Sequence, residues 1–117
     1  MSAPNLVNVV AIYGKTAVQA ITTATTAILT NSTASNKVLK VNALYVSNVD
    51  GSNNYTVNMD IYRSSTSYRL GYAISVPAAG TLDVISKSVY LEEGDSLRLT
   101  ANVASKLEAV CSYEDIS

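Results

Sequence analysis

Hydrophobic and polar residues alternate along several segments of this chain. Between residues 55 and 62, for example, Val57 and Met59 fall on one parity, while Asn58 and Asp60 fall on the other. Because side chains at every second residue share one face of a strand, such a run predicts an antiparallel strand with one buried side and one solvent-facing side. The runs with this pattern are 55–62, 68–76, 97–101 and 107–113.

Two further segments are apolar without a clean alternation. Residues 38–46 are apolar at most positions of both parities, which predicts a central strand covered on both sides. Between Leu82 and Leu91 the apolar positions change parity. A change of that kind predicts a bulge or bend, which we place near Ser86.

The first 30 residues are rich in Val, Thr and Ala, and Gly14 divides them into the runs 6–13 and 17–29. We expect strands here rather than a helix, because several Thr fall within residues 20–27 and β-branched side chains are restricted in helices. Lys15 is the single charged residue of this part of the sequence. If the segment forms a sheet edge, Lys15 is therefore its only charged obstacle to pairing with another chain.

Polar clusters separate the apolar runs at intervals typical of short strands. Together, the runs and clusters predict one all-β domain over residues 1–117, an antiparallel β-sandwich of jelly-roll-like or immunoglobulin-like type. We expect eight or nine strands and no significant helix, with residues 1–12 acting as a contact arm or an edge strand. The predicted turns are 31–36, 48–54, 63–67, 77–80, 92–95 and 102–105.

The composition limits the chemistry that this domain can perform. The 117 residues include no His and one Cys, so neither a Ser–His nor a Cys–His nucleophile pair can form. Lys and Arg number 8 against 9 Asp and Glu, without a basic cluster, which disfavours nucleic-acid binding. No apolar run reaches the roughly 18 residues needed to span a membrane as a helix. We therefore expect no enzyme activity, no cofactor, no bound metal, and neither a nucleic acid nor a membrane as partner.

Two clusters of oxygen-bearing side chains are candidates for catalytic or cation sites. Glu92, Glu93 and Asp95 fall within one turn rather than across a cleft, so we interpret them as a solvated hairpin turn. The loop of residues 48–54 alternates oxygen-bearing side chains, but it lacks the Gly and the Glu that a calcium loop requires at its sixth and twelfth positions. A cation site that does not follow the calcium-loop pattern is the less favoured alternative for this loop.

The tyrosines are the main candidates for contacts with other molecules. Tyr55, Tyr68 and Tyr72 fall on the apolar parity of their strands, which predicts a place in the core or at a protein interface. Tyr62 falls on the polar parity and is expected to be exposed beside Arg63. A sugar-stacking face is the minor alternative for these rings.

Two other patterns have ordinary structural explanations. Cys111 falls on the apolar parity of the last run, which predicts a buried and unreactive thiol. The sequences at 31–33 and 54–56 match the N-glycosylation pattern. In a chain with so many Asn, Ser and Thr residues, we interpret both as chance matches.

Four segments of the chain have distinctive sequences, with YLEEGDSL and SYEDIS as their most specific parts. They are LKVNALYVSNVDG at 39–51, TLDVISKSVYLEEGDSLRLT at 81–100, LEAVCSYEDIS at 107–117 and the opening SAPNLVNV. Together they resemble small virion structural proteins of tailed marine phages, cyanophages in particular. The resemblance implies a non-enzymatic β-sandwich located in the virion after synthesis in the host cytoplasm. It also implies the major capsid protein and further copies of the chain as partners.

Within that resemblance, a capsid decoration (cement) protein is the leading hypothesis, with a neck, collar or tail-associated protein as the alternative. A carbohydrate- or cell-surface-binding module using Tyr62 and Tyr68 is the alternative from another class. We predict the partner contacts at the apolar N-terminal segment and beside the exposed tyrosine. These candidate contacts are Leu6, Val7, Val9, Val10, Ile12, Tyr13, Tyr62 and Arg63.

Overall fold

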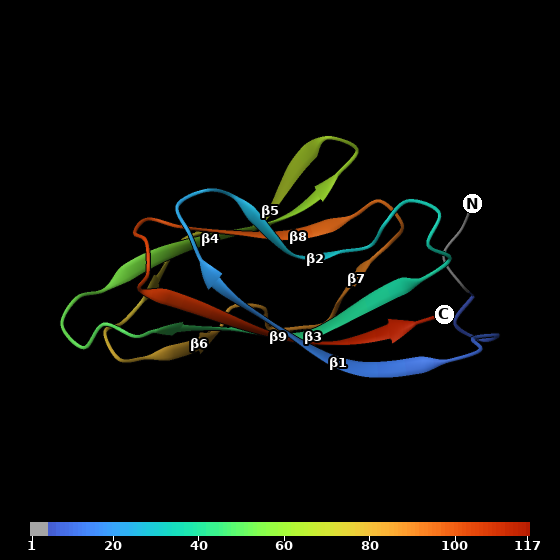
Figure 1. The fold of residues 1–117 in the computed structure, drawn as a ribbon, viewed down its shortest axis with the longest axis horizontal. Helices are drawn as coiled ribbons and strands as arrows, with labels where there is room; N and C mark the ends of the chain where they lie inside the picture. The colour runs from blue at the N-terminus through green and yellow to red at the C-terminus, as the bar shows by residue number, and fades with distance from the viewer. Residues whose placement is uncertain (1–4) are drawn as a thin grey trace.

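The computed structural model describes residues 5–117, which form two antiparallel β-sheets packed as a sandwich (Figure 1). Nine strands and no helix occur in this range, which confirms the predicted fold class. Residues 1–4 of the predicted arm lie outside the described residues. The strands are β1 (Ile12–Ile21), β2 (Thr26–Thr30), β3 (Val38–Asn48), β4 (Tyr55–Arg63), β5 (Thr66–Val76), β6 (Thr81–Asp83), β7 (Val89–Leu91), β8 (Ser96–Ala101) and β9 (Leu107–Ile116).

The two sheets contain five and four strands. The five-stranded sheet has the order β1-β9-β3-β6, with β7 also paired to β3, and the four-stranded sheet has the order β2-β8-β4-β5. The six predicted turn clusters all fall in or beside the connections between these strands. The hydrophobic core lies between the sheets, where Val57 and Met59 of β4 face Leu44 and Val46 of β3, and none of the four is more than 1% exposed.

The strand pairing is that of a jelly roll. β6 and β7 pair with different parts of β3, so they act as one interrupted strand. Counted in this way, the first strand pairs with the last, the second with the next to last, and so on inward to the β4–β5 hairpin. An immunoglobulin-like sandwich would place its first two strands in one sheet, whereas β1 and β2 here belong to different sheets.

The interruption between β6 and β7 confirms the bend predicted near Ser86. Residues 84–88 leave the strand, and Ile85 enters the core with 6% of its surface exposed. The change of parity in the sequence therefore corresponds to a change in the set of residues that face the core.

The prediction that β3 is covered on both sides is wrong. The register with β9 shifts between Val41 and Ala43, so Asn42 is an extra, exposed residue in the strand. Because of the bulge, the residues that face the core have odd numbers up to Val41 and even numbers from Leu44 onward. Both parities therefore look apolar in the sequence, although one face of the strand is open to solvent. Tyr45, on that open face, is 43% exposed.

The N-terminal third contains strands, as predicted, but with different boundaries. Residues 5–11 form no strand, and Gly14 lies inside β1 instead of separating two runs. The chain crosses from one sheet to the other between Ile21 and Thr26 (Figure 1). The segment before β1 is tied to the C-terminus, because the N–H groups of Val10 and Ala11 both donate to the carbonyl oxygen of Ser117.

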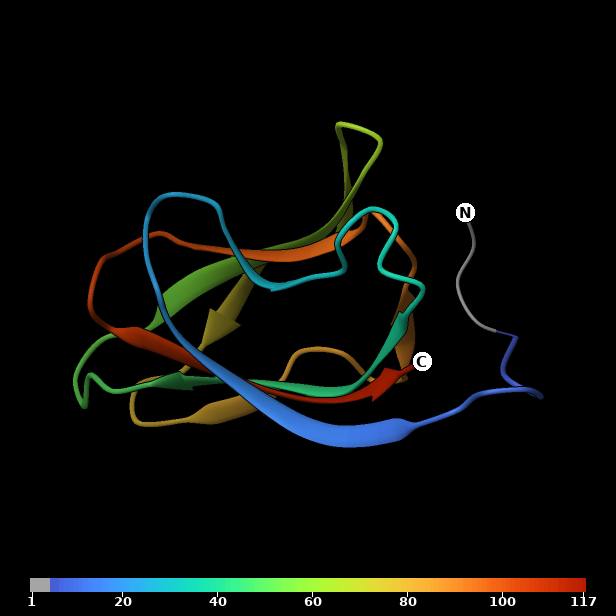
Figure 2. The ribbon, with the colours of Figure 1, turned by 45° about the vertical axis from the view of Figure 1, so that its right-hand side comes forward.

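Of the two places predicted for Tyr68 and Tyr72, the core is wrong, since these side chains are 58% and 68% exposed, and a protein interface stays a prediction. Tyr55 is half-buried against the core, as predicted. The β4–β5 hairpin rises away from the opposite sheet (Figure 2), so its tip has no second layer to cover its inner face. The register shifts twice along this pair, and Ala73 takes a positive φ of 52°.

Candidate functional site

The free edge of β1 differs from the other sheet edges. β2 has five residues and a shift of register, β6 and β7 have three residues each, and β5 carries two shifts. Short length and bulges are devices that discourage pairing with foreign strands. β1 has ten residues and keeps one register along its whole pairing with β9. In the described part of the chain, β1 is therefore the one long and regular edge.

The outer face beside this edge carries a row of exposed apolar side chains. Val18 of β1 lies opposite Val110 of β9, which lies opposite Tyr45 of β3. Their exposed fractions are 74%, 37% and 43%. A shallow cavity of about 350 Å³ follows the row between β1 and β9. We call Val18, Val110 and Tyr45 the apolar row; neighbours across a sheet interact as a unit, so the row offers a continuous contact surface.

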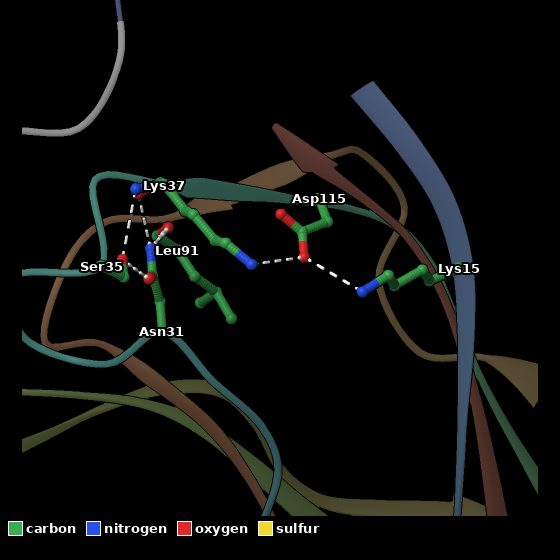
Figure 3. A network of polar contacts seen from close by, with 6 residues as sticks. All are labelled: Lys15, Asn31, Ser35, Lys37, Leu91 and Asp115. Carbon is green, nitrogen blue, oxygen red and sulfur yellow. Dashed lines mark hydrogen bonds and ion pairs between the residues drawn. The ribbon is translucent and has the colours of Figure 1, made fainter. Parts of the chain in front are cut away.

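Lys15, the one charge of β1, is directed away from the apolar row. It lies opposite Tyr113, whose ring packs against the core, so Lys15 belongs to the inner face. Its Nζ lies 3.2 Å from Oδ2 of Asp115, and Nζ of Lys37 lies 3.2 Å from the same oxygen (Figure 3). The one charge of this edge therefore lies on the inner face, half-exposed at one end of the sandwich, and the outer face of β1 carries no charged residue.

Asp115 joins three segments at that end of the sandwich. Its side chain is 7% exposed, while those of Lys15 and Lys37 are 47% and 44% exposed. Ion pairs with half-exposed lysines contribute about 0–1 kcal/mol each, so their main effect is to fix β1 and the segment before β3 around β9. A cavity of about 360 Å³ opens beside this cluster, between β2 and the strands β3 and β9.

A buried asparagine clamps the two sheets at the same end. Asn31, which follows β2, donates its two amide hydrogens to the carbonyl oxygens of Lys37 and Leu91, both at 2.9 Å (Figure 3). Its Oδ1 accepts a hydrogen bond from Ser35 Oγ at 2.5 Å. Asn31 is 2% exposed and both of its amide hydrogens are occupied, so the glycosylation pattern at 31–33 does not present a free acceptor.

A second asparagine makes the equivalent clamp at the other end. Asn48, the last residue of β3, donates to the carbonyl oxygens of Asn53 at 2.8 Å and Val76 at 3.1 Å. Val76 ends β5, so this bond also joins one sheet to the other. Both asparagines appear in the sequence as ordinary turn residues, and no sequence signal separates them from the exposed asparagines nearby.

The predicted contacts of the N-terminal segment lie on or beside the β1 edge. Leu6, Val7, Val10, Ile12 and Tyr13 are exposed. Val9 is half-buried. The segment continues directly into β1, but Tyr13 lies opposite Asp115 and shares the inner face with Lys15, whereas Ile12 shares the outer face with the apolar row.

Tyr62 and Arg63, the other predicted contacts, belong to the four-stranded sheet and are engaged within the protein. Tyr62 is half-buried, and the guanidinium of Arg98 lies 4.0 Å from its ring centroid. Arg98 in turn binds both oxygens of Asp60 at 2.8 and 2.9 Å, and Ser67 Oγ donates to the same carboxylate at 2.5 Å. The structure does not bring Tyr62 and Arg63 together with the N-terminal contacts.

The Asp60 cluster predicts a dependence of stability on acid. Burial raises the pKa of Asp60, but the hydrogen bonds from Arg98 and Ser67 outweigh it and hold the pKa below its ordinary value. A depressed pKa stabilises the fold above the unfolded-state pKa of about 3.9, and this contribution is lost as the pH falls through the lower folded-state pKa. We expect Asp60→Asn to lower the free energy of unfolding by about 2 kcal/mol at neutral pH, and by less in acid.

Urea unfolding at pH 7 and near pH 2.5 measures this difference. Glu108→Gln is the matched control, because Glu108 is exposed on β9. An equal effect of Asp60→Asn at both pH values would contradict the assignment.

The acidic turn is not the solvated hairpin that the sequence predicted. Asp95 is 1% exposed and accepts hydrogen bonds from Arg63 Nε at 2.7 Å and Nη2 at 2.5 Å. Glu92 contacts the same Nη2 at 3.1 Å, and Glu93 Oε2 accepts from the backbone N–H of Asn36 at 2.7 Å. The hydrogen bonds that Arg63 donates to Asp95 raise the pKa of Arg63 above its usual value. The prediction failed for Asp95 because the arginine that it binds lies 32 residues away.

A further hollow lies beside Arg63, near the turn of the β4–β5 hairpin. Its volume is about 340 Å³, and it is lined by Ile61, Arg63, Tyr68 and Tyr90. Tyr68 lies opposite Ile61 in the register, whereas Tyr62 lies opposite Ser67. Tyr62 and Tyr68 therefore occupy opposite faces of the hairpin and form no common stacking surface. Tyr90 of β7 was missed, because the sequence does not reveal that β7 lies beside the hairpin.

Two remaining candidates have structural roles. In the loop at 48–54, Asp50 accepts hydrogen bonds from the backbone N–H of Ser52 and from Tyr55 Oη, both at 2.8 Å, and these bonds lower its pKa. No group of three acidic, Cys or His side chains gathers around a common point in residues 5–117. Cys111 is fully buried, as predicted, and burial raises the pKa of its thiol to about 11.

Comparisons with known proteins give no family for the chain. It matches no protein-family model and no curated protein. Residues 5–117 contain no helix with the length and apolar character needed to cross a membrane.

Proposed function

We propose that the chain is a non-enzymatic structural protein of a tailed-phage particle, specifically a decoration protein that binds the outer face of the major capsid protein and reinforces the shell. The observation that carries the proposal is the β1 edge: ten residues in regular register, beside the exposed apolar row, with Lys15 turned inward. An edge of this kind pairs readily with another strand.

The mechanism requires surface contacts and no chemistry. A strand of the partner, added along β1, would satisfy the unpaired N–H and C=O groups of this edge, and the side chains would then determine the register. Val18 and its neighbours in the apolar row would be covered by the same partner. Removal of this apolar surface from water favours the association.

Three further features support the proposal. The segments at 39–51, 81–100 and 107–117 resemble virion proteins of marine phages. The formal net charge of -1 suits a protein packed in many copies at close spacing, where a large charge would repel itself. Jelly rolls include viral capsid domains, although this is an analogy of fold and carries less weight than the edge itself.

The test is the copy number of the chain in purified particles, measured by quantitative mass spectrometry. A decoration protein follows the symmetry of the shell, so we expect on the order of hundreds of copies per particle. A neck, collar or tail protein would give about a dozen copies or fewer, because those parts have cyclic symmetry. Absence of the chain from particles would overturn the virion assignment as a whole.

A further inference from the structure

The hollow beside the β4–β5 hairpin has two aromatic walls from different parts of the chain. Tyr68 of β5 is 58% exposed and Tyr90 of β7 is 44% exposed, while Ile61 of β4 supplies an apolar side chain between them. The volume of about 340 Å³ lies within the range of roughly 300–1,000 Å³ in which proteins bind small ligands. We call this hollow the Tyr68–Tyr90 cavity.

Arg63 supplies a fixed polar group to the same cavity. Asp95, almost fully buried, holds Nε and Nη2 of its guanidinium, and Glu92 holds Nη2 from the other side. Among the described residues, no acceptor is bonded to Nη1. The arginine is therefore oriented in advance, so that its remaining N–H groups can donate to a ligand with little further loss of side-chain freedom.

The charges around Arg63 determine which ligand fits. The guanidinium group of Arg63 lies beside two carboxylates, those of Asp95 and Glu92. The net charge of the three groups is therefore negative, although Arg63 itself is a cation. An anionic ligand would meet these carboxylates at short range and be repelled, because like charges destabilise one another at such distances. A neutral ligand with oxygen acceptors and an apolar face meets no such penalty.

From these three features we propose that the Tyr68–Tyr90 cavity binds a neutral pyranose saccharide. One C–H face of the sugar ring packs against a tyrosine, and a ring hydroxyl accepts a hydrogen bond from Arg63 Nη1. The C–H groups of a sugar carry a small positive charge, and they pack against the electron-rich face of an aromatic ring. The site does not use β1, so it is independent of the proposed capsid contact.

Saturation-transfer NMR of the full chain with methyl glycosides of glucose, galactose and mannose tests the proposal. We expect at least one of them to bind with a dissociation constant in the millimolar range, at about −4 kcal/mol. Tyr68→Ala and Tyr90→Ala should each weaken that binding about tenfold, since each removes one stacking wall. Methyl glucuronide, which adds a carboxylate to the same ring, should bind more weakly than methyl glucoside.

Tyr72→Ala is the matched control, because Tyr72 is an exposed tyrosine of the same strand that does not line the cavity. It should leave the dissociation constant unchanged, and circular dichroism should show that all three variants are folded. The proposal is overturned if no neutral glycoside binds, as expected for a cavity that serves a protein partner. It is also overturned if both cavity variants bind normally, or if the glucuronide binds best.

Discussion

Val18→Lys is expected to abolish attachment of the protein to its particle, with a loss of at least about 100-fold in the association constant. Val18 is the most exposed member of the apolar row and lies on the β1 edge itself. A lysine there would put an ammonium group into the apolar surface that the partner covers, and such burial costs several kcal/mol. Because Val18 is 74% exposed, the free energy of unfolding should change by no more than about 0.5 kcal/mol.

Co-sedimentation with particles that lack the protein measures this attachment. Val49→Lys makes the same chemical change at a residue that is 56% exposed, in the loop after β3. It should attach like the wild-type protein. If Val18→Lys also attaches normally, or if both variants fail equally, the β1 edge is not the contact.

The largest losses of stability outside the core are expected from Asn31→Ala and Asn48→Ala. Each substitution leaves two backbone carbonyl oxygens without their donor, in positions where the asparagine is 2% or 3% exposed. An unsatisfied buried polar group costs about 1–3 kcal/mol, so we expect each variant to lose about 3 kcal/mol. Because each asparagine joins the two sheets, the loss should affect the cooperative unfolding of the whole domain.

Denaturant unfolding measures both values, with Asn53→Ala as the control. Asn53 is exposed, and its side chain makes one long hydrogen bond of 3.4 Å to Asp50, so its loss should stay near 0.5 kcal/mol. If the three variants were equally stable, the buried asparagines would not be clamps between the sheets.

The fold class could be predicted from the sequence because the alternation of apolar and polar residues within a strand is a local pattern. Alternation at 55–62 places Val57 and Met59 inward, and the change of parity before Leu91 marks the interruption near Ser86. Turn chemistry also acts over a few residues, which explains why all six turn clusters were placed correctly.

Features that depend on distant segments were not predictable in the same way. A bulge at Asn42 reverses the parity of β3, so an apolar run appeared to be covered on both sides. The β4–β5 hairpin extends past the opposite sheet, and its tyrosines are exposed although their parity is that of the core. Parity reports which face a side chain occupies, and only the packing of the other sheet determines whether that face is covered.

The candidate sites also combine features that the sequence shows with features that depend on distant segments. The apolar and uncharged character of residues 6–13 is visible in the sequence, and it predicts contacts at Ile12 and Tyr13. The sequence does not show that β1 is an edge, or that Val18, Val110 and Tyr45 align across three strands. Pairing order determines both, and it joins residues that lie about as far apart as the chain allows.

The most direct test is an electron-microscopy map of the intact particle at a resolution that separates strands. The proposed function predicts that β1 pairs with a strand of the neighbouring subunit, so that the five-stranded sheet continues into it and the apolar row is covered. A map in which the β1 edge faces solvent while another surface contacts the shell would contradict it.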